Sequence, residues 1–295
     1  MNYNEILAAA KDQVGPYCKA CPVCNGRACA NAMPGPGCKY PGNAAARNFD
    51  KWQEIFVNMD TLCPNAEPDV SFELFGHRFA APIFAAPLGS IDLHYGPKYK
   101  DHAYNSILVK AAAEYGVMAL TGDGVDPTIM LSSVEDMKKV NGIGCPVIKP
   151  WNKEAVFEKL DVLNANGIFA AGMDVDGAGL PFLKAMNPNA GSKSVDEMRE
   201  IISYAKMPFI VKGIMTVRGA ERPLKPVLPP SSSQTTAGAF RAACPPRRKS
   251  CRRLPRRSRE RRPCLSTAAY AQASMCSAPS PSVLTLFWSA DPFSR

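Results

Sequence analysis

The sequence predicts an α/β fold built on a parallel sheet, and two observations support this prediction. Short apolar segments alternate with amphipathic segments whose apolar residues recur at helical spacing. The apolar segments are continuous rather than alternating in polarity, which is typical of parallel strands that are covered on both faces. Five such strand-then-helix units can be distinguished before residue 222.

The strands are expected, in chain order, at residues 81–87, 117–122, 145–151, 168–175 and 208–214. Helices are expected between them at residues 102–115, 132–140, 153–166 and 194–206. The second and fourth helices begin with capping-box spacing, in which a serine is followed three residues later by a glutamate. These pairs are Ser132 with Glu135 and Ser194 with Glu197.

The ends of the strands favour a TIM (β/α)8 barrel over a doubly wound sheet. Polar residues follow the apolar runs, among them Thr121, Lys149, Asp174 and Lys212. TIM barrels place their chemistry at the C-terminal ends of their strands. The sequence has neither a GxGxxG nor a Walker motif, which would mark a nucleotide loop. Because a barrel needs eight strands, we expect an incomplete one with about five recognisable units.

The composition changes abruptly near residue 221. Residues 222–295 hold 14 of the 35 basic residues, 2 of the 26 acidic residues and 11 of the 27 prolines. The formal net charge of +9 therefore comes from this tail, and residues 1–221 are slightly acidic. Clusters of Pro, Ser and Arg bury too little apolar surface to offset chain entropy, so we expect the tail to be disordered.

Three segments carry a resemblance to a known family. SFELFGHRFAAPIFAAPLGS, GMDV and PFIVKGIMT resemble the FMN-dependent α-hydroxy acid oxidase/dehydrogenase family, which includes glycolate and lactate oxidases. The nearest branch is bacterial and cysteine-rich. The resemblance implies a TIM barrel with FMN at the C-terminal strand ends. It also implies oxidation of a small (S)-2-hydroxy acid, such as lactate or glycolate, to the 2-oxo acid.

The resemblance also assigns roles to residues of this chain. Lys212 would lie beside flavin N1 and the C2 carbonyl, where an ammonium group stabilises the charge of reduced flavin. Asp174 would orient the catalytic histidine. The remaining residues expected to bind the cofactor are Ala86, Pro87, Gly89, Thr121 and Lys149. Each has a simpler alternative, such as an ordinary strand-end lysine, a loop aspartate or a strand-to-loop turn.

Some positions depart from the family pattern. Lys149 stands where the family has a glutamine, and Gly172 stands where it has a threonine. Residues 176–179, DGAG, occupy a loop that in the family carries an arginine for the substrate carboxylate. An aspartate does not replace a bidentate arginine, so the identity of the hydroxy acid stays open.

The general-base histidine of the family is missing from this chain. The only histidines are His77, His94 and His102, and none follows a sixth strand. We interpret all three as surface or loop residues. The chain as written is therefore expected to be inactive.

The sequence is expected to divide into three segments. Residues 1–66 form a cysteine-containing cap, residues 67–221 form an incomplete FMN-binding barrel, and residues 222–295 form the tail.

A shift of the reading frame explains the tail. Moving one base permits residues 233–239 to encode Ser-Asn-His-Gly-Gly-Arg, which is the family motif with the catalytic histidine. The same shift permits Phe-Val-Asp-Gly-Gly-Ile-Arg-Thr from residues 264–272 and Ala-Val-Leu-Val-Gly-Arg-Pro-Phe from residues 285–293. We interpret residues 222–295 as out of frame. The alternative is a basic arm for nucleic acid or acidic lipid.

The N-terminal cysteines suggest a metal site. Cys18, Cys21, Cys24 and Cys29 have the close spacing of zinc or iron–sulfur ligands. The alternative is a set of reduced thiols in a loop that covers the barrel.

Other function classes stay open or are disfavoured. A different FMN-binding or phosphate-binding barrel, related to isopentenyl diphosphate isomerase or IMP dehydrogenase, is one alternative, and a metal-binding or redox module is another. The sequence has no run of apolar residues long enough for a membrane span and no secretory signal, so a cytoplasmic protein is expected. We expect no specific nucleic-acid partner. Homo-oligomers are expected only if the full barrel forms.

Overall fold

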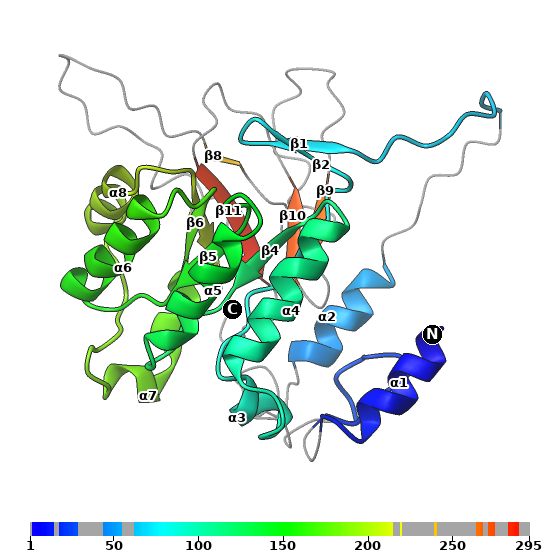
Figure 1. The fold of residues 1–295 in the computed structure, drawn as a ribbon, viewed down its shortest axis with the longest axis horizontal. Coiled ribbons are helices and arrows are strands. Elements are labelled where there is room, and N and C mark those ends of the chain that lie inside the picture. The colour runs from blue at the N-terminus through cyan, green and yellow to red at the C-terminus, as the bar shows by residue number, and fades with distance from the viewer. Residues whose placement is uncertain are drawn as a thin grey trace.

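The computed structural model describes residues 2–14, 18–28, 44–54 and 62–214, residue 219, and the strand residues 239–240, 264–267, 271–274 and 283–288 (Figure 1). The N-terminal part contributes helices α1 (Tyr3–Lys11) and α2 (Ala44–Trp52). It is followed by a hairpin of strands β1 (Phe72–Leu74) and β2 (His77–Phe79). None of the helices in the described part of the chain has the length and apolar character needed to cross a membrane.

Strand and helix then alternate through residue 212. The strands of this region are β3 (Phe84–Ala85), β4 (Met118–Thr121), β5 (Cys145–Ile148), β6 (Ala171–Asp174) and β7 (Phe209–Lys212). The helices are α3 (Ile91–Tyr95), α4 (Asp101–Glu114), α5 (Thr128–Lys138), α6 (Lys153–Ala165), the 3-10 helix η2 (Val175–Gly179), α7 (Pro181–Lys184) and α8 (Val195–Tyr204). All five expected strands are confirmed, each within its expected range.

The five strands form one parallel sheet in the order β3-β4-β5-β6-β7. Helices α4, α5, α6 and α8 cover its outer face (Figure 1). Side chains alternate between the two faces along each strand. In β4, for example, Ala119 packs toward the helices, whereas Met118 and Leu120 pack on the inner face. Burial on both faces explains why the strands are continuously apolar.

The hairpin covers the starts of these strands. Phe79 and Phe84 are buried together on the inner face with residues of β4, β5 and β7. The backbone N–H of Ala80 donates to the carbonyl of Gly116, just before β4, at 2.8 Å. The ring of Phe79 also lies 5.9 Å from that of Phe169, just before β6. The hairpin therefore lies at the opposite end of the sheet from the C-terminal ends of the strands, where a TIM barrel carries its active site.

One helix start differs from the expectation. Helix α5 begins at Thr128, so Ser132 and Glu135 lie inside it and do not form a capping box. The Ser132 hydroxyl instead donates to the carbonyl of Ile129 at 3.2 Å. The chain turns into the helix earlier, because the Asp126 carboxylate accepts the backbone N–H of Thr128 at 2.8 Å. The capping box of Ser194 and Glu197 at the start of α8 is confirmed.

Strands from the tail extend the sheet. Strand β11 (Val283–Trp288) pairs in parallel with β7, and β8 (Ala239–Phe240) pairs in parallel with β11. Strands β10 (Ala271–Ser274) and β9 (Cys264–Thr267) follow in antiparallel order. The edge of β7 is thus paired with β11. The described residues form a partial barrel without eight parallel strands, and most of the tail expected to be disordered lies outside them.

Candidate active site

Three charged side chains meet at the ends of neighbouring strands. Lys149 follows β5, Asp174 ends β6 and Lys212 ends β7, where Asp174 and Lys212 are directly opposite in register. The alternation of side chains places all three on the inner face, in line with Val147 and Ile210. Lys149 Nζ lies 2.5 Å from Asp174 Oδ2, and Lys212 Nζ forms an ion pair with Asp174 Oδ1.

A fourth charge comes from the loop after β6. Asp176, in η2, has its Oδ1 3.2 Å from Lys212 Nζ. Gly213 makes room for it, since that residue has φ +95° and a side-chain Cβ there would collide with the Asp176 carboxylate. We call this group the charge cluster; its members are Lys149, Asp174, Asp176 and Lys212. The Lys212 side chain is only 2% exposed, so the cluster holds its charges largely out of water.

The pKa values of the two carboxylates of the cluster are shifted in opposite directions. For Asp174, burial acts to raise the pKa, but the ammonium groups of Lys149 and Lys212 outweigh it and hold the pKa well below its usual range. For Asp176, burial and the negative charge of Asp174 exceed the attraction of Lys212 and raise the pKa to about 7. Burial acts to lower the pKa of Lys149, but the Asp174 carboxylate raises it overall.

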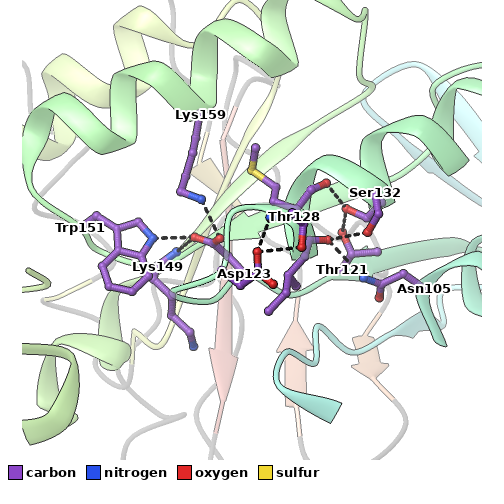
Figure 2. Close-up of polar contacts among 12 residues, drawn as sticks. Asn105, Thr121, Asp123, Thr128, Ser132, Lys149, Trp151 and Lys159 are labelled. Carbon is purple, nitrogen blue, oxygen red and sulfur yellow. Dashed lines mark hydrogen bonds and ion pairs between the residues drawn. The ribbon is translucent and has the colours of Figure 1, made fainter. Parts of the chain in front are cut away.

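A second polar network lies on the outer side of the same strand ends (Figure 2). Asp123, just after β4, accepts the backbone N–H of Lys149 at 3.0 Å and the indole N–H of Trp151 at 2.7 Å. Lys159 Nζ, from α6, donates to its other oxygen at 2.8 Å. We call this group the Asp123 network. It consists of Asp123, Trp151, Lys159 and the backbone N–H of Lys149.

The other residues expected to bind the cofactor lie in different places. The Thr121 hydroxyl donates to Ser133 Oγ of α5 at 3.0 Å, so it faces the helices rather than the charge cluster. Ala86, Pro87 and Gly89 lie in the partly exposed loop after β3. Gly89 packs closely against the next strand end, since a Cβ there would lie 2.7 Å from the carbonyl oxygen of Asp123.

Comparison with known proteins identifies the family. The family described as FMN-dependent dehydrogenase matches residues 37–182. The chain belongs to this family. No curated protein sequence is significantly similar to this FMN-dependent dehydrogenase homologue.

Solved structures show the same fold. A putative lactate oxidase from Pediococcus acidilactici superposes with a TM-score of 0.53 and 16% identity over 74% of this chain and 62% of that one. A mandelate oxidase superposes with a TM-score of 0.53 and 19% identity over 75% of this chain and 64% of that one. The chain thus spans less than two thirds of the length of either structure.

The chemistry of the charge cluster fits the flavin of the FMN-dependent dehydrogenase family. Lys212 and Lys149 bring two ammonium groups to one buried position at the strand ends. Two ammonium groups there can offset negative charge on a ring system. Gly89 and Gly122 keep side chains out of the loops after β3 and β4, where a Cβ would collide with the neighbouring backbone. Of these residues, Lys149 and Lys212 could hold the flavin ring of FMN, whereas the two glycines allow the neighbouring loops to pack against each other.

The histidines of this FMN-dependent dehydrogenase homologue lie elsewhere. His102 is exposed near the start of α4. His77 was expected in a loop or on the surface, but it belongs to β2 and is partly buried, with its ring 4.5 Å from that of Phe79. It therefore sits near the starts of the strands, at the opposite end from the charge cluster. The side chain of His94 lies outside the described residues.

The N-terminal cysteines are placed only in part. Cys18 and Cys21 are partly exposed and Cys24 is exposed, whereas Cys29 lies outside the described residues. Within the described ranges, three or more His, Cys, Asp or Glu side chains are nowhere grouped so that they could hold a metal ion. The expected metal site stays a prediction.

Sequence reasoning missed the roles of Trp151, Lys159 and Asp176. The alternation of side chains along β4 does predict the orientation of two other residues. Residues 119, 121 and 123 share one parity, so Thr121 and Asp123 should face the helices together with Ala119. Lys159 lies within α6 (Lys153–Ala165), and the strand pattern gives no comparable signal for its position.

Proposed function

We propose that this protein derives from an enzyme that oxidises a small (S)-2-hydroxy acid, such as lactate or glycolate, to the 2-oxo acid with FMN. The observation that carries the proposal is the pairing of Lys149 and Lys212 with one carboxylate, Asp174, at the ends of adjacent parallel strands. FMN, when bound, accepts the hydride equivalent from the α-carbon.

The residues of the cluster would have distinct roles. The Lys212 ammonium, fixed by Asp174 and Asp176, would stabilise negative charge that develops on the flavin ring. Lys149 would add a second positive charge beside it. Asp174 would hold both lysines in place, and in a complete barrel it would also orient the histidine that takes the hydroxyl proton. The buried setting strengthens each of these interactions.

We infer that the chain as written does not carry out this reaction. No histidine follows Lys212 in the sequence, so nothing supplies the expected general base. The composition of residues 222–295 supports a reading-frame shift at or just after Glu221. In this proposal residues 1–66 form a cap, residues 67–221 form the FMN-binding part, and the remaining residues are translated out of frame.

Two proteins test the proposal: the chain as written and a version from a gene in which one base restores the frame after codon 221. The restored protein should purify with a flavin spectrum that lactate or glycolate bleaches in the absence of oxygen. The chain as written should be colourless. A restored protein that binds no FMN would refute the proposed function, and bleaching in the original chain would refute its inactivity. Sequencing the gene across codons 215–230 checks the frame itself.

The zinc or iron–sulfur site remains a separate proposal. It rests on the spacing of Cys18, Cys21, Cys24 and Cys29 alone. Metal content of the purified full-length chain, compared with the variant Cys21→Ser, tests it. Equal and negligible zinc and iron in both proteins would rule out the site.

A further inference from the structure

The Asp123 network supplies a second layer behind the charge cluster. Asp123 stands where the loops after β3 and β4 pack most closely. At Gly122, a Cβ would collide with the carbonyl group of Leu88, and at Gly89 it would lie 2.7 Å from the carbonyl oxygen of Asp123. The backbone that carries Asp123 is therefore fixed by two glycines, each of which allows the neighbouring loop to approach.

The carboxylate of Asp123 is fully engaged. Its side chain is 0% exposed, and its two oxygens accept three donors. A buried carboxylate is stable only when it is paired and hydrogen-bonded, and here Lys159 supplies the charge and two N–H groups complete the shell. Asp123 faces the helices rather than the barrel interior. It therefore has no oxygen left to contact a substrate or cofactor on the inner face.

The donors to Asp123 Oδ2 flank a single residue, Pro150. One is the backbone N–H of Lys149 and the other is the indole N–H of Trp151. The carbonyl of Pro150 accepts the N–H of Gly191 at 2.9 Å, and Trp151 is 1% exposed. This short segment is thus held from both sides at the point where β5 ends and Lys149 turns inward.

We propose that Asp123 is a positioning residue of the candidate active site, which fixes the backbone of Lys149 so that its ammonium group reaches Asp174 beside Lys212. The geometry supports this: one carboxylate joins the end of β4 and helix α6 to the residue whose side chain bridges β5 and β6. A role of the Lys149 ammonium group in a reaction rests on the proposed flavin function. The positioning of Lys149 by Asp123 does not.

Selective acylation of lysines tests the proposal on the full-length chain without any cofactor. Acetic anhydride reacts with the neutral amine, so a lysine held as an ammonium by a carboxylate reacts slowly. Peptide mass spectrometry would give the rate at Lys149 relative to exposed Lys206. In Asp123→Asn the relative rate at Lys149 should rise about fivefold. Without Asp123 the backbone of Lys149 is no longer fixed, so its amine loses contact with the Asp174 carboxylate that keeps it protonated. Asp174→Asn is the positive control and should give a similar rise.

The double variant Asp123→Asn with Asp174→Asn should react no faster at Lys149 than Asp174→Asn alone, since both changes remove the same contact. A lower melting temperature of Asp123→Asn with an unchanged relative rate would mean a purely structural role and would overturn the proposal. So would equal acceleration at Lys149 and Lys206. If acylation behaves as expected but the frame-restored protein binds no FMN, the proposed function fails while the positioning role of Asp123 stands.

Discussion

The charge cluster and the Asp123 network use similar groups on opposite faces of the same sheet. The network has one carboxylate, Asp123, and three donors, so both of its oxygens are used for structure. The cluster has two carboxylates and two ammonium groups, and Asp176 retains a pKa of about 7. A network whose carboxylate oxygens are all paired with protein donors fixes geometry. A cluster that titrates near neutrality is suited to chemistry.

The largest expected effect comes from removing the cation that the two carboxylates of the cluster share. Lys212→Met should destabilise the protein by about 3–5 kcal/mol at pH 8, because breaking a buried ion pair leaves uncompensated charge. Urea unfolding measures the change. Lys206→Met, at an exposed lysine, is the matched control and should leave the midpoint unchanged. A small loss in Lys212→Met would show that water, rather than Lys212, solvates Asp174 and Asp176.

The corresponding change in the Asp123 network should cost less. Trp151→Phe removes the indole N–H that donates to Asp123 but keeps an aromatic ring in a site that is 1% exposed. We expect a loss of about 2 kcal/mol from the unmade hydrogen bond and the smaller ring. The control is Tyr204→Phe, which removes a 2.7 Å hydrogen bond to Asp161 on the surface. Equal effects of the two variants would contradict the contrast between buried and exposed donors.

The pH dependence of stability separates the two carboxylates of the cluster. Because the folded-state pKa of Asp176 is raised to about 7, the native state keeps a proton that the unfolded state releases near pH 4. Stability therefore falls as the pH rises from about 4 to 7 through this group. Asp174, whose pKa is lowered, contributes stability that is present above pH 4 and is lost as the pH falls through its folded pKa.

Asp176→Asn should remove the falling part of that curve. The variant should be more stable than the parent protein at pH 8, by on the order of 2 kcal/mol, and nearly equal to it at pH 4. Lys212, Lys149 and Asp174 remain in both proteins, so the difference between the two curves reports the Asp176 carboxylate together with its interaction with these neighbours. Thermal unfolding across this range gives the difference. A difference that does not vary with pH would mean that Asp176 is ionised throughout.

The strand pattern predicts much of this arrangement, and the loops account for what it misses. Continuous apolar runs locate β3 to β7, and the charged residues at their ends mark Lys149, Asp174 and Lys212. Alternation along β4 also predicts that Thr121 faces the helices. The partnership of Asp123 with Lys159 could not be predicted, because it depends on how α6 packs over the sheet 36 residues later. The pairing of β11 with β7 has no signal in the composition of the tail.

The smallest expected effect concerns local helix starts, where the same sequence signal has two outcomes. At Ser194 the hydroxyl accepts the N–H of Glu197 at 3.2 Å and the Glu197 carboxylate accepts the N–H of Ser194 at 2.6 Å, so Ser194→Ala should cost about 1 kcal/mol. Ser132 lies within α5, where its hydroxyl only duplicates a helical contact, and Ser132→Ala should change stability by less than about 0.5 kcal/mol.

Chemical denaturation of the two alanine variants under identical conditions makes this comparison directly. The substitutions are chemically the same and both lie on helices that cover the sheet, so a difference in stability isolates the cap. If Ser132→Ala is as costly as Ser194→Ala, then α5 begins near Ser132 in solution. The turn at Asp126 and Thr128 would in that case not be the start of the helix, and the loop that carries Asp123 would have to be longer.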